Sequence, residues 1–201
     1  TDERFDYERL AKVINDLSPD IVALQEVDRG VARTAGADQP AALAALPGSL
    51  RRYIRVSHQA RPEDLAAAQT AYAEAGIDAD VQPFFQDIPR RMAEAQLVIS
   101  RAGAAVLAEY PEMGLPAILV PYPHAAAGHQ STNARAMAAK GAAMTLEEAD
   151  LTPERLASLI NGLLHDRTSI RTMASAARGL ARRGASARLL QECRAVLEEA
   201  I

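Results

Sequence analysis

An excess of positive charge is missing from this sequence, and so is any long apolar run. Lys12 and Lys140 are its only lysines, and its formal net charge is −4. Because affinity for nucleic acids comes mostly from clustered Lys and Arg, this balance argues against a nucleic-acid-binding protein. No stretch approaches the roughly 18 uninterrupted apolar residues that a membrane-spanning helix needs. We therefore expect a soluble protein with no nucleic-acid partner and no membrane span.

Cysteine is almost absent as well. Cys193 is the only one, so no internal disulfide can form, and a reducing compartment suits the chain. It falls in a helical pattern, where we expect it to be a small buried hydrophobe. The polar start TDERFDYER does not have the pattern of a signal peptide. The sequence therefore predicts a cytoplasmic protein.

Residues 1–40 predict a helix, a buried strand and a loop. Apolar residues recur at helical spacing over 5–17, until Ser18-Pro19 ends the pattern before the apolar run 21–24. Residues 28–40 are rich in Gly, Asp and Arg and have no periodicity, which indicates a loop.

From residue 41 onward, short apolar runs alternate with helical patterns. The expected strands are 53–57, 80–82, 97–100, 117–120 and 142–145, and the expected helices are 41–46, 62–76, 88–95, 104–113 and 130–140. This alternation predicts an α/β fold, a Rossmann-like parallel sheet with helices on both faces, which binds ligands at the carboxyl ends of its strands. The remaining chain is helical, and Thr152 as N-cap before Pro153 and Glu154 marks its start.

Four strings of the sequence together resemble one family. They are VSHQARPEDL (56–65), PFFQDIPRRMAEAQLVISRAGA (83–104), GLPAILVPYPHA (114–125) and HQSTNARAMAAKGAA (129–143). In order and spacing, residues 41–201 resemble the C-terminal domain of the MurG-type N-acetylglucosaminyltransferases. The resemblance implies the C-terminal half of a GT-B glycosyltransferase of peptidoglycan synthesis, a single α/β domain that binds UDP-GlcNAc.

The segment 1–40 does not continue this resemblance and is similar to a different superfamily. Its string RFDYERLAKVINDLSPDIVALQEVDRGVARTAGADQ (4–39) resembles the N-terminal part of the endonuclease/exonuclease/phosphatase superfamily. In that superfamily LQEVD ends an early core strand, and its Glu, here Glu26, holds the catalytic divalent metal. The MurG family instead has a glycine-rich GGSQGA loop at this point, which faces the phosphate and sugar. We therefore interpret the chain as a chimera, with a natural fusion and a machine-made recombination as the alternatives. One carboxylate does not hold a catalytic Mg²⁺, so we expect no metal, no cofactor and no phosphodiesterase activity.

The string Ser100-Arg101-Ala102-Gly103-Ala104 joins a strand end to a helix start, where free N–H groups and the helix dipole favour a phosphate. The resemblance places Arg101, Gly103 and Ala104 beside the UDP pyrophosphate, although the family usually has Ser at Ala102. It also implies that Glu109 accepts hydrogen bonds from both ribose hydroxyls, which suits a carboxylate with two oxygens. The alternatives are an ordinary strand-helix turn and a solvated Glu.

Other site residues follow from the same resemblance. The backbone of Phe84 and Phe85 would read the uracil edge, with core packing as the alternative for one of the two rings. Gln130 and Asn133 would bind sugar hydroxyls, Gln because it offers a donor and an acceptor. His129 precedes Gln130, and His124 would line the crevice. Neither these histidines nor His58 and His165 have a Cys or carboxylate at ligand spacing, so we expect no zinc site.

Three functions remain open at this stage. The chain resembles a hexosyltransferase, but the family's acceptor site lies largely in an N-terminal domain, so we do not expect catalysis by this chain alone. A binding domain for UDP or UDP-GlcNAc is the second hypothesis. The third is a chimeric fold without function. Because the interdomain face would be exposed, we also expect a homo-oligomer.

Overall fold

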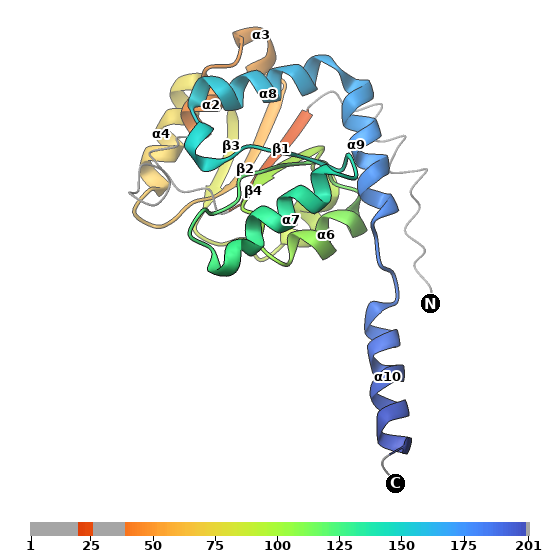
Figure 1. Cartoon of the computed structure of the whole chain (residues 1–201). Coiled ribbons are helices and arrows are strands. Elements are labelled where there is room, and N and C mark those ends of the chain that lie inside the picture. The colour runs from red at the N-terminus through yellow and green to blue at the C-terminus, as the bar shows by residue number, and fades with distance from the viewer. Residues whose placement is uncertain (1–19, 26–38, 200–201) are drawn as a thin grey trace.

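One parallel sheet organises the molecule. The structure is a computed structural model that describes residues 20–25 and 39–199. In the described residues the sheet has six strands in the order β3-β2-β1-β4-β5-β6, and every neighbouring pair is parallel (Figure 1). The strands are β1 (Asp20–Gln25), β2 (Ile54–Gln59), β3 (Asp78–Gln82), β4 (Leu97–Ser100), β5 (Ala117–Leu119) and β6 (Ala143–Thr145). The predicted α/β fold is confirmed.

Helices connect these strands and then continue to the C-terminus. The α-helices are α2 (Gln39–Ala44), α3 (Gly48–Arg51), α4 (Leu65–Ala75), α5 (Ile88–Glu94), α6 (Val106–Met113), α7 (His129–Ala138), α8 (Pro153–His165), α9 (Arg167–Gly179) and α10 (Ala185–Glu199). The described residues also contain two short 3-10 turns, η2 (Ala126–Gly128) and η3 (Glu148–Asp150).

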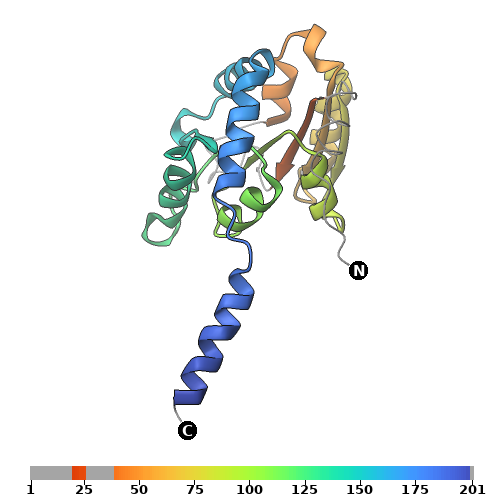
Figure 2. The same ribbon diagram turned by 90° about the vertical axis from the view of Figure 1, so that its right-hand side faces the viewer.

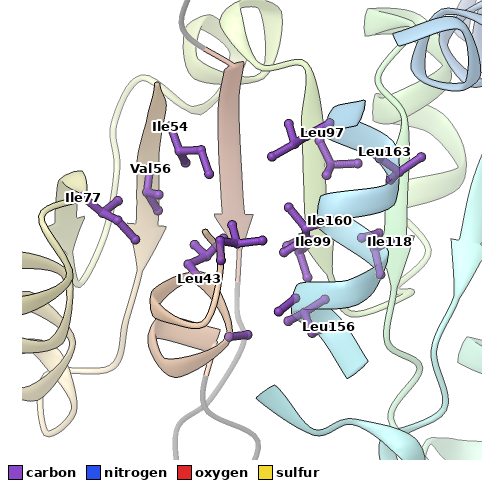
Figure 3. Packing of buried hydrophobic residues seen from close by; sticks show 14 of the residues in the cluster. Leu43, Ile54, Val56, Ile77, Leu97, Ile99, Ile118, Leu156, Ile160 and Leu163 are labelled. Carbon is purple, nitrogen blue, oxygen red and sulfur yellow. The ribbon is translucent and has the colours of Figure 1, made fainter. Parts of the chain in front are cut away.

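The two faces of the sheet bury separate apolar clusters because side chains of a strand alternate between its faces. In β4, Leu97 and Ile99 join the cluster beneath α2, α4 and α8, whereas Val98 joins the cluster beneath α5, α6 and α7. Figure 3 shows the first cluster, in which Leu156 and Ile160 of α8 face the strand residues. Helices therefore cover both faces, as the alternation predicted.

The strand expected at 21–24 lies at the centre of the sheet. As β1 it pairs with β2 on one side and β4 on the other, with Val22 in register with Val56 and Leu97. The helix expected at 5–17 lies outside the described residues, as does Glu26. The loop expected over 28–40 is wrong at its end, because α2 already begins at Gln39. Pro40 fits the first turn of this helix, where a missing N–H costs nothing.

Local signals located the helix ends well. Helices α4 and α6 end at Gly76 and Gly114, whose φ values of 67° and 61° are left-handed and therefore favour glycine. At the start of α8, the Thr152 hydroxyl accepts a hydrogen bond from Arg155 N at 3.2 Å, so the predicted N-cap is confirmed.

The last helix stands apart from the others. Helix α10 extends away from the sheet in both Figure 1 and Figure 2. Leu189 and Leu190 on this helix are exposed, and so is Cys193. The prediction that Cys193 is buried was wrong, because helical periodicity does not say whether a helix has anything to pack against. No helix in the described ranges is long and apolar enough to cross a membrane.

Asp166 caps α9 and gives a pH-dependent prediction. One of its carboxylate oxygens accepts hydrogen bonds from Thr168 N and Ser169 N, both at 3.1 Å, and the other accepts one from Ser169 Oγ at 2.6 Å. The hydrogen bonds from Ser169 lower the pKa of Asp166 below its ordinary value of 3.8. A lowered pKa in the folded state adds stability above the unfolded-state pKa, and this stability is lost as pH falls through the folded-state pKa.

We therefore expect Asp166→Ala to lower the melting temperature by about 2–4 °C near neutral pH. The difference from wild type should shrink as pH falls below about 4, because protonation removes the same contacts in the wild type. Thermal unfolding followed by circular dichroism over this pH range measures both effects. Asp166→Asn is the control, since Asn is also a good N-cap. A difference that stays constant down to the lowest pH would contradict the prediction.

Candidate functional site

The sheet topology locates a crevice. From β1 the chain continues to β2 and β3 on one side, and it then returns to the other side of β1 as β4. Ligands of such sheets bind outside the carboxyl ends of the strands, where the direction of the strand order reverses. The loop after β4 carries Arg101, Gly103 and Ala104, and the loop after β5 carries His124. The fold thus brings these predicted residues to one edge of the sheet.

Two predicted sugar-binding side chains meet at Ala102. Gln130 Oε1 accepts hydrogen bonds from Ala102 N at 3.3 Å and Tyr122 N at 2.9 Å. Asn133 Nδ2 donates to Ala102 O at 3.0 Å. Both side chains come from the first turns of α7, so this helix fixes the loops that follow β4 and β5.

These hydrogen bonds leave half of each amide group available. Within the described part of the chain, Gln130 Nε2 and Asn133 Oδ1 have no hydrogen-bond partner. Both residues are only partly buried. One donor and one acceptor therefore remain on neighbouring turns of α7, a combination that suits hydroxyl groups.

The start of α6 offers free backbone donors. Among the described residues, the N–H groups of Gly103, Ala104 and Ala105 have no hydrogen-bond partner, and Ala104 and Ala105 are exposed. A Cβ added at Gly103 would meet no atom within 4 Å, so the space above this backbone is open. Unpaired N–H groups at a helix N-terminus, together with the helix dipole, favour an anion.

Glu109 presents a carboxylate on the same helix. It lies in the first turn of α6 and is exposed, and its carboxylate makes no ion pair or hydrogen bond with the described residues. Its neighbour Tyr110 is buried and donates a hydrogen bond to Ser100 Oγ at 2.8 Å, which ties α6 to the end of β4. The helix is therefore fixed while the Glu109 carboxylate faces solvent.

Arg101 is engaged with the protein itself. Its Nη1 lies 2.5 Å from Glu148 Oε2, in an ion pair whose side chains are 13% and 8% exposed. The same Nη1 donates to Val120 O at 3.3 Å, and the guanidinium carbon lies 5.5 Å from the Tyr122 ring centre. Sequence reasoning missed Glu148, because a Glu in an irregular segment carries no signal of its distant partner. Contact between Arg101 and a ligand stays a prediction.

The two phenylalanines after β3 differ in exposure. Phe84 is 66% exposed, whereas Phe85 is 3% exposed and has the core role expected for one of the pair. Within the described ranges, the backbone N–H and C=O groups of both residues make no hydrogen bond. Backbone groups that are free in this way are what readout of a base edge requires.

The four histidines have different surroundings. His124 is exposed and packs edge-on against Tyr122, with ring centres 5.6 Å apart. His129 is exposed, and its Nδ1 lies 2.6 Å from Ala126 O. His58 is buried with its Nδ1 3.1 Å from Tyr72 Oη, and His165 is exposed. Among the residues with described positions, no group of three His, Cys, Asp or Glu side chains is placed to hold a metal ion.

Comparison with known proteins gives consistent matches. The profile described as glycosyltransferase family 28 C-terminal domain matches residues 9–189. The UDP-N-acetylglucosamine–N-acetylmuramyl-(pentapeptide) pyrophosphoryl-undecaprenol N-acetylglucosamine transferase of Syntrophotalea carbinolica is 46% identical over 170 residues, covering 83% of this chain and 48% of that protein. MurG of Acinetobacter baumannii has a TM-score of 0.71 at 30% identity, over 86% of this chain and 51% of its own. WaaG, at 19% identity and a TM-score of 0.62, shares the fold over 89% of this chain and 47% of its own.

The family match also bears on the N-terminal segment. It begins at residue 9 and runs through the region that we interpreted as foreign, and no comparison supports an endonuclease-like segment or a chimera. That interpretation rested on the resemblance of residues 4–39 to another superfamily, and the strand within this segment, β1, lies at the centre of the sheet of this chain. The chain spans about half the length of the relatives that it matches. It belongs to the glycosyltransferase family 28 C-terminal domain family.

Proposed function

We propose that this chain forms one α/β domain that binds UDP-N-acetylglucosamine, as the donor half of a peptidoglycan N-acetylglucosaminyltransferase. The observation that carries this proposal is the set of unpaired polar groups at one edge of the sheet. They differ in kind, and each suits a different part of a nucleotide sugar. The relatives' own names, which specify N-acetylglucosamine transfer, support the choice of sugar.

The diphosphate is assigned to the start of α6. The N–H groups of Gly103 and Ala104 have no partner among the described residues, and a Cβ added at Gly103 would meet no atom within 4 Å. The N-terminus of a helix carries a partial positive charge that favours phosphate without a further cation. Arg101 lies in the same loop, and its ion pair with Glu148 holds that loop in place.

The remaining parts of the ligand are assigned to side chains and backbone around this point. The Glu109 carboxylate accepts from the two ribose hydroxyls, one per oxygen. Gln130 Nε2 and Asn133 Oδ1 bind sugar hydroxyls, with His124 and His129 at the margin of the crevice. The backbone of Phe84 and Phe85 binds the uracil edge. Residues 26–38, which follow β1, lie outside the described structure and have no part in this assignment.

Sugar transfer itself needs an acceptor site and a base. The S. carbinolica relative is about twice as long as the matched segment, and we propose transfer only for the donor half acting within such an enzyme. That the chain alone does not catalyse transfer stays a prediction. So does self-association, for which the exposed Leu189 and Leu190 of α10 are available.

Isothermal titration with UDP and UDP-GlcNAc tests the proposal. We expect binding of both, and a reduction of at least about tenfold in the Gly103→Val variant, because its side chain would occupy the phosphate position at the helix N-terminus. Since a Cβ at Gly103 meets no protein atom within 4 Å, the variant should melt at the wild-type temperature. Gly48→Val, at the exposed start of α3, is the matched control. Absence of heat at millimolar ligand would refute the proposal and favour a fold without this function.

A further inference from the structure

Arg91 joins several elements beside the proposed base-binding segment. It lies on α5 with its side chain 17% exposed. Its Nη2 is 2.7 Å from Asp80 Oδ2, its Nε donates to Asp87 Oδ1 at 2.7 Å, and its Nη1 donates to Ser57 Oγ at 2.8 Å. The guanidinium carbon lies 3.9 Å from the centre of the Phe85 ring. All three nitrogens and one face of the guanidinium are therefore engaged.

These partners come from different parts of the sheet edge. Ser57 belongs to β2, Asp80 belongs to β3, and Asp87 directly precedes α5. Only a planar guanidinium, which donates in several fixed directions and can also stack on a ring, can serve all of them at once. A neutral side chain would leave the Asp80 and Asp87 carboxylates without their shared cation. A Lys ammonium would keep the charge, but it could not donate in the same fixed directions or stack on the ring in the same way.

The segment between β3 and α5 needs such support. In the described structure, the backbone of residues 83–86 makes no hydrogen bond. Its fixed points are the buried Phe85 ring beneath the guanidinium and the Asp87 carboxylate. The hydrogen bond from Arg91 lowers the pKa of Asp87, so this carboxylate remains charged in mildly acidic solution.

We propose that Arg91 is a positioning residue that fixes the backbone of Phe84 and Phe85, where the base of the nucleotide binds. This inference rests on the proposed function. The fixed backbone gives selectivity for a base that presents a carbonyl and a ring N–H. Uracil presents such an edge, whereas cytosine has an amino group and an unprotonated ring nitrogen in the same places. Fixing the backbone donor and acceptor before binding saves the entropy of ordering them. Arg91 acts through Phe85 and Asp87, because each of its three nitrogens already has a protein partner.

The test compares ligands that contain the base with one that lacks it. We expect Arg91→Met to reduce UDP affinity about tenfold in isothermal titration, which corresponds to the loss of a preorganised base contact. Affinity for inorganic pyrophosphate should not change, and the ratio of UDP to CDP affinity should fall toward one. Arg91→Lys should recover part of the loss. Arg90→Met is the matched control, since Arg90 is the exposed neighbour and pairs only loosely, at 3.5 Å and 3.6 Å, with Asp87 and Glu94.

A second measurement keeps this inference separate from the proposed function. In ¹⁵N relaxation experiments without ligand, the amides of residues 84–86 should have order parameters near about 0.85 in the wild type and below about 0.6 in Arg91→Met. If Arg91→Met does not fold, Ser57→Ala removes one contact and should give a smaller change in the same direction. If Arg91→Met loses equal affinity for UDP and for pyrophosphate, or if its order parameters are unchanged, Arg91 does not position the base-binding backbone. Absence of UDP binding by the wild type, with the relaxation difference present, would refute the proposed function alone.

Discussion

Glu109→Gln is expected to weaken UDP binding by about 10- to 100-fold, the range for losing hydrogen bonds to a charged group. The variant keeps the size of the side chain but replaces one acceptor oxygen with a donor group. The carboxylate is exposed and makes no contact with the described residues, so the melting temperature should not change. Isothermal titration with UDP measures the loss.

The ribose assignment can be separated from a general effect of charge. With 2′-deoxy-UDP, the wild type should bind more weakly than it binds UDP, and Glu109→Gln should no longer distinguish the two ligands. Glu112→Gln is the matched control, because Glu112 lies on the same helix and pairs at 3.7 Å with Arg183. If Glu109→Gln binds UDP as the wild type does, the ribose is not bound by this side chain.

Arg101→Met is expected to lower the free energy of unfolding by about 3–5 kcal/mol, because it leaves the buried Glu148 carboxylate without its cation. The two side chains are only 13% and 8% exposed, so solvent screens this pair little. The double variant Arg101→Met/Glu148→Leu removes both charges and should recover much of the loss, so the two substitutions should be far from additive. Urea unfolding measures all of these values. A single-variant loss below about 1 kcal/mol would mean that the pair behaves like an exposed one.

Two single variants, Arg101→Met and Glu148→Gln, distinguish two ways in which Arg101 could contribute to ligand binding. If Arg101 acts by holding the loops after β4 and β5, then Glu148→Gln should also weaken UDP binding, although Glu148 lies on η3 and is buried. If Arg101 contacts the diphosphate, only its own substitution should have a large effect. Titration of both single variants with UDP distinguishes the two roles.

The site residues were found in the sequence only through the family resemblance. Spacing placed Gly103 and Ala104 after a strand, and the resemblance pointed to Glu109 and Gln130. Neither the spacing nor the resemblance indicated which hydrogen bonds these residues make within the protein. Gln130 uses its oxygen to hold Ala102 N and Tyr122 N, so only its amide nitrogen remains for a ligand. A sequence shows that an amide is present, but it does not show which of its atoms the protein itself has already used.

The misinterpreted segment has a similar explanation. A buried parallel strand requires little more than a short apolar run, so strands of unrelated folds can look alike over a few residues. The resemblance of residues 4–39, centred on the strand that ends in LQEVD, was therefore weak support for a foreign origin. Strand β1 pairs with both β2 and β4 and so lies inside the sheet, a position that a short sequence string does not reveal.

The sequence by itself determined the features that depend on local chemistry. Alternating apolar runs and helical patterns gave the parallel sheet, and the ends of helices at Gly76, Gly114 and Thr152 followed from backbone conformation and capping. The tertiary structure alone decided which distant side chains meet. Arg101 reaches Glu148 and Arg91 reaches Ser57 because parallel pairing brings separate strand ends to one edge, and exposure such as that of Phe84 or Cys193 depends on which elements pack nearby.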